Sequence, residues 1–557
     1  MSKLIQLDQA IARHVKPGMA VHLTTQARAG TRALQRVFQG QPMDLTLIVG
    51  RVGGSWSADL LNSGLVKHVI SGSYGMVSRN YTGRLRQVEA VYASGEVTFQ
   101  HWSFWSLMQR LIAAAHGFPY GLTHSLSGST LAEGNPDYLE VIDPFDASRK
   151  VAAVRALHPD IAIVHVDAAD EDGNAILLPP SEEGVWGAKA SRGGVIVMAE
   201  RIVDHNFIHQ HSHLVRLPAR YVRAVCHVPF GAHPGAFGHA DLEGFDVYRE
   251  DHEFSDAYVE ATRDPDKLSA WVDYWITGVK GQEGYLERLG ASRLASLRER
   301  NSGPKSVLAA NASQCYKPAN DNEILMTLAM REVIKRTAES GCDVFLVGAG
   351  LSEVPATAAY SMLKQQGIEV SLTMGHGYYG FEPQPGRTET EPSTARMNTD
   401  TPEIYGVVLG GRLGRTLAIL GTAQVDRWGN LNSTLIDGRL LIGSGGSNDA
   451  SSMCQTLVVI RSGRRKLVKL VEYATCSGRN VRTVITEQGV FEKIGDAQTL
   501  SLVSYVDREG QGRDKSVQAI AQECGWELEV SPTLQPAPLP SSQELELVRS
   551  LMPKRYA

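Results

Sequence analysis

Ile161–Asn174 reads IAIVHVDAADEDGN, and Leu417–Asn430 reads LAILGTAQVDRWGN. In each stretch an apolar run leads into the pattern D-x-x-G-N, and the two aspartates, Asp170 and Asp426, are 426 − 170 = 256 residues apart. Short runs rich in Val and Ile are typical of buried strands, while Asp, Gly and Asn favour turns. The same strand and turn found twice predict that the chain contains two related halves.

Other parts of the chain alternate between strand and helix patterns. Short apolar runs predict strands over Leu45–Val52 and Val66–Tyr74 in the first half, and over Asp343–Val347 and Glu369–Thr373 in the second. Apolar residues at helical spacing predict a helix over Ile324–Ser340, which Gly341 ends. This alternation predicts α/β domains with mainly parallel sheets.

The length agrees with two such halves. The chain has 557 residues, and domains hold roughly 100–200 residues each. The polar, Arg-rich stretch Gly290–Asn322 is the natural joint. We therefore expect one domain over residues 1–290, a linker over 291–322, and a second domain over 323–557.

Composition excludes several classes of protein. The 55 Lys and Arg residues nearly balance the 60 Asp and Glu residues, which argues against a strongly basic nucleic-acid binder. No apolar run approaches the ~20 residues of a membrane span, and the N-terminus lacks a signal-peptide pattern. The six cysteines are scattered without a C-x-x-C pair, which argues against a disulfide framework and a thiolate zinc site. We expect a cytoplasmic protein without a bound metal, and without nucleic-acid or membrane partners.

Glycine-rich loops follow three predicted strands of the second half. Gly443, Gly445, Gly446 and Asn448 lie in the densest one, where backbone N–H groups can approach a phosphate or a developing oxyanion. The alternative is a tight strand-to-helix turn. Gly348 and Gly350 end a second strand, and Gly375-His376-Gly377 ends a third. Ligands of open α/β sheets bind at the carboxyl ends of strands, so these loops can converge on one crevice.

His376 is the candidate acid or base of these loops, because histidine titrates near neutral pH. The alternative is a histidine bonded to the loop backbone. The cluster of His205, His209, His211 and His213 matches no zinc pattern and is interpreted as a solvated connector. Arg461–Lys469 predicts a hairpin with a basic tip, with an anion-docking site as the alternative. Aromatic residues are assigned to core packing, with a substrate pocket as the alternative: Trp102, Phe104 and Trp105.

Together these residues resemble family I CoA-transferases of the glutaconate CoA-transferase type, with α- and β-type subunits fused. In the second half the resemblance rests on Ala423–Thr434 and the glycine loop Gly443–Asn448. In the first half it rests on Thr24–Leu34, Arg110–Leu122, Ser125–Ser129, Ala168–Asn174, Ala199–Val203 and Pro229–Pro234. It implies two related α/β domains with mainly parallel sheets and a coenzyme A thioester as substrate, with no bound cofactor. We also expect a carboxylate acceptor and a homo-oligomer.

One loop departs from the family pattern. Family members carry a glutamate in a Glu-x-Gly loop, and its carboxylate attacks the thioester to form a covalent intermediate. Alignment on Gly377 places Gly375 at that glutamate, with His376 beside it. Gly375 therefore marks a missing nucleophile. Glu382, seven residues further on (382 − 375 = 7), does not belong to this loop pattern.

Three functions stay open. The first is an enzyme that moves coenzyme A between carboxylic acids, with His376 as acid or base and the glycine loops around the thioester. The second is a thioester hydrolase that opens a ring by retro-Claisen cleavage, or a decarboxylase; Tyr248–Val279 and Leu539–Leu545 resemble the steroid-ring-opening hydrolases. In that branch an α-half glutamate acts at a position that Phe104 occupies here. The third is a non-catalytic acyl-CoA binder.

Overall fold

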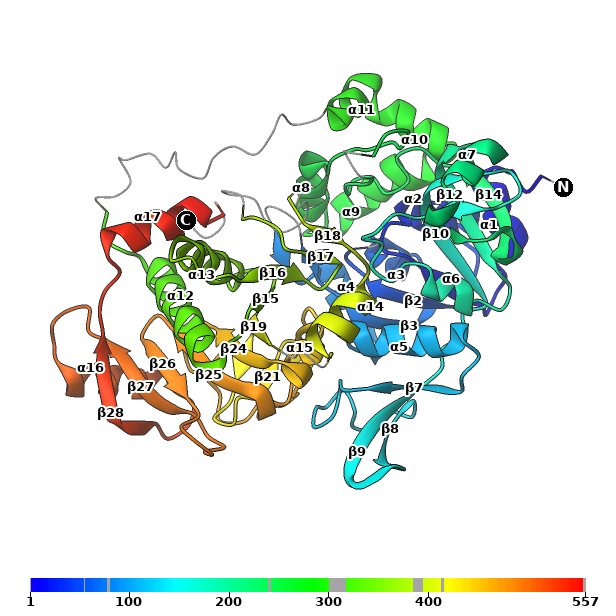
Figure 1. The fold of residues 1–557 in the computed structure, drawn as a ribbon. Helices are drawn as coiled ribbons and strands as arrows, with labels where there is room; N and C mark the ends of the chain where they lie inside the picture. The colour runs from blue at the N-terminus through cyan, green and yellow to red at the C-terminus, as the bar shows by residue number, and fades with distance from the viewer. Residues whose placement is uncertain are drawn as a thin grey trace. The chain divides into compact units, whose positions relative to one another are not determined.

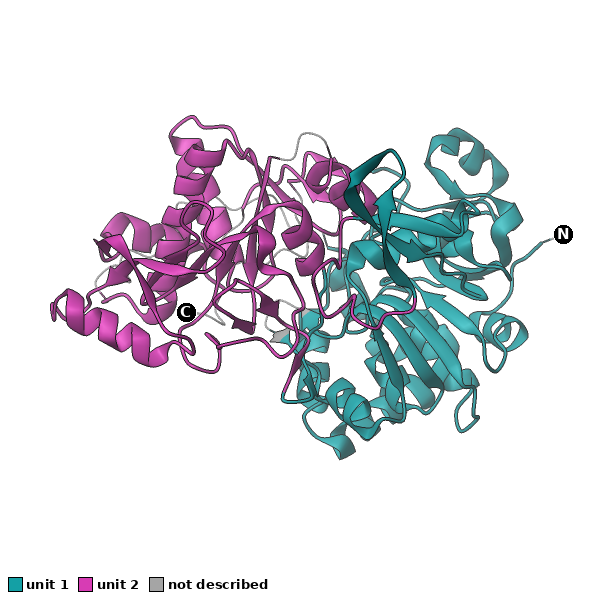
Figure 2. Ribbon diagram, turned by 90° about the horizontal axis from the view of Figure 1, so that it is seen from below, with its two compact units in different colours: residues 1–123, 137–302, 437–445 teal, residues 124–136, 303–436, 446–557 magenta. Residues whose placement is uncertain are grey.

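The computed structural model describes residues 2–54, 56–77, 81–238, 242–299, 317–383, 394–411 and 415–553. It divides into two compact units (Figure 2). Unit 1 comprises residues 1–123, 137–302 and 437–445, and unit 2 comprises residues 124–136, 303–436 and 446–557. The predicted ranges 1–290 and 323–557 do not include this exchange of two short segments. Of the predicted linker, Ala291–Arg298 forms helix α11, and residues 300–316 lie outside the described residues.

Unit 1 is built on a mainly parallel sheet, as the apolar runs predict (Figure 1). Its parallel strands lie in the order β14-β12-β10-β1-β2-β3-β6, and the short strands β11 and β13 extend it antiparallel from β10. The described strands of this sheet are β1 (Ala20–Leu23), β2 (Leu45–Arg51), β3 (Val66–Ser73), β6 (Thr98–His101), β10 (Ile161–Ala169), β11 (Ala175–Ile176), β12 (Val195–Ile202), β13 (Val215–Leu217) and β14 (Val222–His227).

Helices cover the sheet of unit 1. Helix α2 approaches closely, because a Cβ atom on Gly30 would lie only 2.8 Å from Ile163 Cγ2 of β10. The helices of unit 1 are α1 (Leu7–His14), α2 (Arg28–Val37), α3 (Ala58–Asn62), α4 (Arg86–Ser94), α5 (Phe104–Ala115), α6 (Trp186–Ala190), α7 (His205–Gln210), α8 (His252–Ala261), α9 (Pro265–Val272), α10 (Gly281–Leu289) and α11. Strands outside the main sheet are β4 (Met76–Val77), β5 (Thr82–Gly83), β7 (Tyr120–Thr123), β8 (Tyr138–Asp143), β9 (Asp146–Arg155) and β23 (Arg439–Leu440).

Unit 2 repeats the parallel order of unit 1 within its own sheet. Its strands lie in the order β18-β17-β16-β15-β19-β24-β25-β26-β27-β28, with β16 to β25 parallel. The described strands are β15 (Val344–Val347), β16 (Ser371–Met374), β17 (Tyr378–Tyr379), β18 (Met397–Asn398), β19 (Thr416–Gly421), β24 (Gln455–Val459), β25 (Val481–Thr486), β26 (Gly489–Glu492), β27 (Ser501–Val506) and β28 (Glu529–Ala537). Shorter strands are β20 (Gln424–Val425), β21 (Leu431–Asn432) and β22 (Leu435–Ile436).

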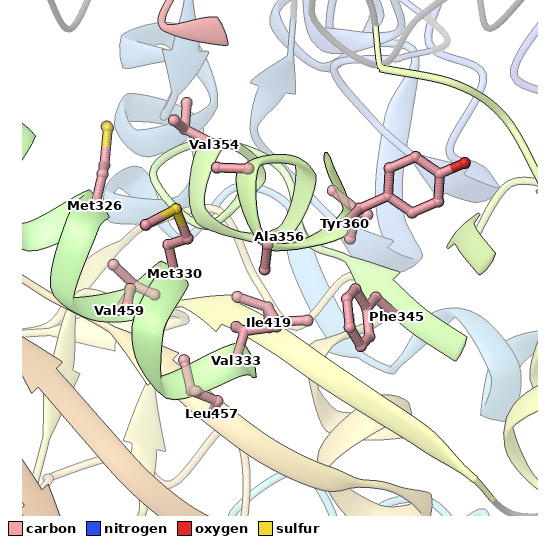
Figure 3. Packing of buried hydrophobic residues seen from close by; sticks show 14 of the residues in the cluster. Met326, Met330, Val333, Phe345, Val354, Ala356, Tyr360, Ile419, Leu457 and Val459 are labelled. Carbon is pink, nitrogen blue, oxygen red and sulfur yellow. The ribbon is translucent and has the colours of Figure 1, made fainter. Parts of the chain in front are cut away.

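The first helix of unit 2 forms where the sequence pattern predicts it. Helix α12 covers Asp321–Ser340; Asn320 and Glu323 cap its start, and Gly341 ends it in a left-handed conformation with φ 66°. Its apolar face packs with α13 and the strands of the sheet into a buried cluster that includes Met330, Ile419 and Leu457 (Figure 3). The other helices are α13 (Glu353–Gln365), α14 (Thr401–Glu403), the π-helix η5 (Ile404–Leu409), α15 (Ser447–Met453), α16 (Arg513–Glu523) and α17 (Ser542–Leu551).

The α/β class and the mainly parallel sheets are confirmed, but one local prediction is wrong. Arg461–Lys469 is not a hairpin tip, because the strands before and after it, β24 and β25, pair in parallel. The connection between parallel strands must cross back along the sheet, and the basic residues lie in a turn of that connection. Trp102 and Trp105 are buried as packing predicts, and the Arg110 guanidinium lies 4.2 Å from the Trp102 ring centre.

The histidine cluster lies in a helical connector of unit 1. His205 begins α7, and His213 lies in a following 3₁₀ turn. His205, His209 and His213 are exposed, while the His211 ring stacks on Phe207 at 4.2 Å between ring centres. The solvated-connector interpretation agrees with this arrangement.

Candidate functional site

The repeated D-x-x-G-N turns have similar hydrogen bonds, of which those from the asparagine backbone and side chain to the aspartate are common to both. The Asp170 carboxylate accepts hydrogen bonds from the backbone of Gly173 and Asn174 and from the Asn174 side chain, each at 2.8 Å. The Asp426 carboxylate accepts the corresponding two bonds from the backbone and the side chain of Asn430, each at 3.0 Å. It also accepts the Trp428 N–H at 3.0 Å and the Val471 N–H at 3.4 Å. Both turns follow matching strands, β10 and β19, so the sequence echo reflects a repeated structural unit.

The pairing of neighbouring strands shows which residue of the first half is equivalent to Gly375, the position of the missing nucleophile. Ile161 and Leu417 each lie nine residues before the turn aspartate (170 − 161 = 426 − 417 = 9), and they pair with Val21 and Phe345. Val21 in turn pairs with Leu47, and Phe345 pairs with Leu372.

Three residues after Leu47 and Leu372 the chain reaches Gly50 and Gly375 (47 + 3 = 50; 372 + 3 = 375). These glycines are therefore equivalent in the two halves. Both lie near the place where strand order reverses, between β1 and β10 and between β15 and β19. Ligands of open α/β sheets bind at such places.

His376 lies at the tip of a tight turn between β16 and β17. Thr373 pairs with Tyr379 and Met374 with Tyr378, so Gly375, His376 and Gly377 alone make the turn. Gly377 has φ 120°, a conformation that favours glycine. The His376 side chain is half-buried, and its ring centre lies 6.2 Å from that of Tyr378.

Gly348 and Gly350 shape the turn between β15 and α13. The Gly348 N–H donates to the Ile419 carbonyl at 3.1 Å, and a Cβ atom on Gly348 would lie 2.7 Å from that oxygen. Gly350 has φ 96°, and its carbonyl accepts the Glu353 N–H at 3.2 Å. The contacts of both glycines thus support the tight-turn interpretation, and the Gly348 N–H is already used within the sheet.

Tyr405 brings Gly375 and Gly446 to one point in unit 2. A Cβ atom on Gly375 would lie 2.9 Å from Tyr405 Cζ, and one on Gly446 would lie 2.7 Å from the same atom; the hydroxyl oxygen is nearer still in both cases. Real Cβ atoms do not approach other atoms so closely, so both positions must be glycine while Tyr405 stays there. Tyr405 belongs to the π-helix η5 and is 3% exposed.

Gly443 and Gly445 belong to unit 1 and contact its β3 end. The Gly445 N–H donates to the Gly72 carbonyl at 2.8 Å, and the Gly445 carbonyl accepts the Phe104 N–H at 3.0 Å. Gly443 has φ 81°, and a Cβ atom there would meet the Tyr74 ring at 3.0 Å. The expected role of Gly445 as a donor to a thioester is thereby corrected, because its N–H is already bonded within the protein.

Asn448 holds a segment from the first half of the chain in unit 2. Its side-chain oxygen accepts the Leu126 N–H at 2.8 Å, and its side-chain nitrogen donates to the Thr475 carbonyl at 2.8 Å. Beside it, the Ser125 hydroxyl donates to Asp449 at 2.6 Å. Asn448 is fully buried, and its hydrogen bonds fasten residues 124–136 within unit 2.

Unit 1 places two carboxylates near Gly50, of which Glu183 is buried and Glu182 is partly exposed. Glu183 Oε1 accepts the Gly50 N–H at 3.0 Å, and the Thr25 hydroxyl donates to Glu183 at 3.0 Å and to Glu182 at 2.9 Å. Arg51 forms an ion pair with Glu182. Burial, and then the neighbouring Glu182 charge, raise the pKa of Glu183 to about 7. A Cβ atom on Gly50 would lie 3.0 Å from Glu183 Cδ, so this carboxylate fills the space beside Gly50.

The structure therefore unites some predicted site residues and separates others. Gly375 and Gly446 meet at Tyr405, and His376 lies in the same turn as Gly375. Phe104 contacts Gly72 and Gly445 in unit 1. Sequence reasoning missed Tyr405 and Glu183, because neither belongs to a motif and each reaches its glycine from a distant segment.

The described residues contain neither a candidate metal cluster nor a candidate membrane-spanning helix. Within them, no group of three or more His, Cys, Asp or Glu side chains is placed to hold a metal ion. No helix in the described part of the chain is long and apolar enough to cross a bilayer.

Comparison with known proteins gives consistent matches to coenzyme A transferases. The family described as coenzyme A transferase matches residues 4–227. One subunit of the glutaconate CoA-transferase of Acidaminococcus fermentans is 29% identical over 316 residues, which is 54% of this chain and 95% of the relative. One subunit of the 3-oxoadipate CoA-transferase of Pseudomonas knackmussii is 30% identical over 286 residues, which is 50% of this chain and 95% of the relative.

A solved structure extends the likeness of fold to the whole chain. The acyl-CoA transferase YdiF of E. coli O157:H7, in a thioester complex with coenzyme A, superposes with a TM-score of 0.68. The superposition covers 99% of this chain and 98% of that one, at 16% sequence identity. Both units therefore have the fold found in that protein.

Proposed function

The chain belongs to the coenzyme A transferase family, and from this premise we propose that it moves coenzyme A between carboxylic acids. Its substrates would be an acyl-CoA thioester and a carboxylate acceptor. The observation that carries the proposal is the repeated strand-and-turn unit, present in both halves and combined with a full-length likeness of fold to an acyl-CoA transferase.

The glycine at position 375 determines which route this transfer can take. A glycine has no carboxylate, so no acyl-enzyme can form at that residue. Transfer would then use a complex with both substrates. The acceptor carboxylate attacks the thioester carbonyl, the C–S bond breaks, and coenzyme A leaves as a thiolate. The thiolate attacks the acceptor carbonyl of the mixed anhydride, forming the new thioester and releasing the donor acid as a carboxylate.

His376 is the titratable side chain that we assign to this step in unit 2. It lies beside Gly375, it is half-buried, and an imidazole can accept or donate a proton near neutral pH. Gly446, on the other side of Tyr405, would contribute backbone to the same site. Gly348, Gly350, Gly443, Gly445 and Asn448 would contribute by shaping the loops and fastening their segments.

One experiment separates transfer from its rivals. The protein is incubated with succinyl-CoA or glutaryl-CoA, with and without acetate, glutaconate or 3-oxoadipate, while free thiol and acyl-CoA species are measured. Transfer predicts a new acyl-CoA that requires the acceptor, with kinetics of a complex containing both substrates rather than ping-pong kinetics. Equal release of free coenzyme A with and without acceptor contradicts transfer.

Thioester hydrolysis or C–C cleavage is the second candidate. The observation that favours it is the absence of a carboxylate at Gly375, since water or a ring-opening step does not need a covalent acyl-enzyme. Release of coenzyme A or of a ring-opened product without an acceptor supports this candidate. Loss of CO₂ identifies a decarboxylase, and binding without turnover identifies an acyl-CoA binder.

The remaining features of the proposal concern assembly and location. We expect a single fused chain that acts as a homo-oligomer and needs no bound cofactor. A cytoplasmic location is supported by the cysteines, because the five in the described residues are unpaired and buried. Gel filtration and cell fractionation test these two points.

A further inference from the structure

Two glycines of unit 2 leave room for one hydroxyl group. Tyr405 Oη lies against both Gly375 and Gly446, and the ring carbon that carries it is within 3 Å of where either Cβ atom would be. We propose that Tyr405 replaces the missing carboxylate as the polar group that faces the reacting carbonyl, and that it requires glycine at position 375. The first part of this inference rests on the proposed function; the second part rests on geometry alone.

Packing explains why Tyr405 and Gly375 form a coupled pair. Any side chain at position 375 would begin with a Cβ atom that overlaps the Tyr405 hydroxyl and lies 2.9 Å from Tyr405 Cζ. Tyr405 is 3% exposed and belongs to a π-helix rather than an ordinary α-helix. A buried ring in such a turn cannot move aside at low cost, so a carboxylate at position 375 and a tyrosine at position 405 exclude each other.

The chemistry of a phenol suits this position. A phenolic O–H can donate a hydrogen bond to a thioester oxygen and stabilise the negative charge that develops there during attack. It forms no acyl-enzyme in this role, which agrees with a route through a complex of both substrates. Tyr405 also lies in a π-helical segment, and such short segments occur frequently at functional sites.

Unit 1 has an arrangement of the same kind at the equivalent position. Gly50 corresponds to Gly375 by strand register, and Glu183 fills the space beside Gly50 as Tyr405 fills the space beside Gly375. In both halves a polar side chain from another segment thus occupies the space that a side chain on the glycine would need. The repeat indicates that a glycine with a polar neighbour is a property of this fold position in the chain.

The first test removes only the hydroxyl group. Tyr405→Phe keeps the ring, and we expect its kcat with an acyl-CoA substrate to fall by about 10- to 100-fold with little change in the KM for that substrate. Tyr379→Phe, in neighbouring strand β17, is the matched control and should stay within about twofold of the wild type. A Tyr405→Phe variant with the full kcat would overturn the catalytic part of the inference.

The second test needs no turnover. Gly375→Ala should lower Tm by several degrees in the wild-type background and much less in a Tyr405→Ala background, because the clash is then gone. Equal effects in both backgrounds would overturn the coupling of the two residues.

The two tests separate failures of different origin. If the wild type turns over acyl-CoA and Tyr405→Phe is equally active, the proposed function is sustained and the catalytic role of Tyr405 is rejected. A wild type inactive on every acyl-CoA rejects the proposed function and, with it, the catalytic role. The stability measurements then decide alone whether Tyr405 requires glycine at position 375.

Discussion

At the scale of single residues, Gly375 and the side chain beside it decide what the candidate site can do. Gly375 stands where the family resemblance implies a nucleophilic glutamate, and Tyr405 occupies the space that a side chain there would need. The space beside Gly375 is therefore filled by Tyr405, although Gly375 itself has no side chain. Restoring the family residue is not a matter of one substitution.

Gly375→Glu should destabilise the protein rather than create a ping-pong enzyme, because its Cβ atom overlaps the Tyr405 hydroxyl. We expect a loss of about 1–3 kcal/mol, or more if the charge is buried. Thermal unfolding measures the loss, and intact-protein mass spectrometry after incubation with an acyl-CoA measures any covalent adduct.

Gly421→Glu is the matched control for that substitution. Gly421 is exposed at the end of β19, and a Cβ atom there would meet only the Val459 carbonyl, at 4.0 Å. This variant should unfold near the wild-type temperature. A stable Gly375→Glu protein that accumulates an acyl adduct would show that Tyr405 can give way.

At the scale of elements, the repeated turns connect sequence to fold. Asp170 and Asp426 each accept three hydrogen bonds that close a turn behind a central strand, and both are almost fully buried. Predicting this geometry from the sequence was possible because Asp, Gly and Asn act locally, within five residues. The prediction of a hairpin at Arg461–Lys469 was wrong because the strands on either side of it pair in parallel, and the local sequence does not determine which way two strands pair.

Asp170→Ala and Asp426→Ala should cost similar amounts, about 2–4 kcal/mol each, because each leaves three donors of its turn without their acceptor. Asp426→Ala also loses the longer bond from the Val471 N–H, at 3.4 Å. Urea unfolding of the two variants measures the free energy of unfolding. Asp172→Ala, exposed in the same turn as Asp170, is the control and should cost less than ~0.5 kcal/mol. Clearly unequal costs for Asp170 and Asp426 would contradict the equivalence of the two turns.

A second element, the segment 124–136, depends on Asn448. Asn448→Ala removes the acceptor of the Leu126 N–H and the donor to the Thr475 carbonyl, both within unit 2. We expect faster amide hydrogen exchange at Leu126 and Ser129, by about tenfold or more, as local opening becomes easier. Exchange in the core helix α12 is the internal reference, and an unchanged rate at Leu126 would show that Asn448 does not fasten the segment.

At the scale of the whole molecule, buried carboxyl groups make stability depend on pH. Burial raises the pKa of Asp59 to about 7, against the opposing hydrogen bonds from Tyr258 and Gln87. Between pH 4 and 7 the folded protein therefore retains a proton on Asp59 that the unfolded chain has lost. Because the folded state binds more protons there, the free energy of unfolding falls as pH rises through this range.

Asp59→Asn should flatten this part of the pH profile, because asparagine has the shape of the protonated acid and does not titrate. We expect the wild type to lose about 1–3 kcal/mol more than the variant between pH 5 and pH 8. Urea unfolding at several pH values tests this, with the exposed Asp172→Asn as control. Parallel profiles for wild type and Asp59→Asn would contradict the raised pKa.

The sequence by itself determined the α/β class, the repeat of two related halves, the turns at Asp170 and Asp426, and the absence of a carboxylate at Gly375. These features depend on neighbours in the chain, through apolar periodicity and turn preferences. Only the tertiary structure decided what fills the space beside Gly50 and Gly375. Glu183 and Tyr405 come from 133 and 30 residues away (183 − 50; 405 − 375), and only strand register and packing bring them to equivalent positions.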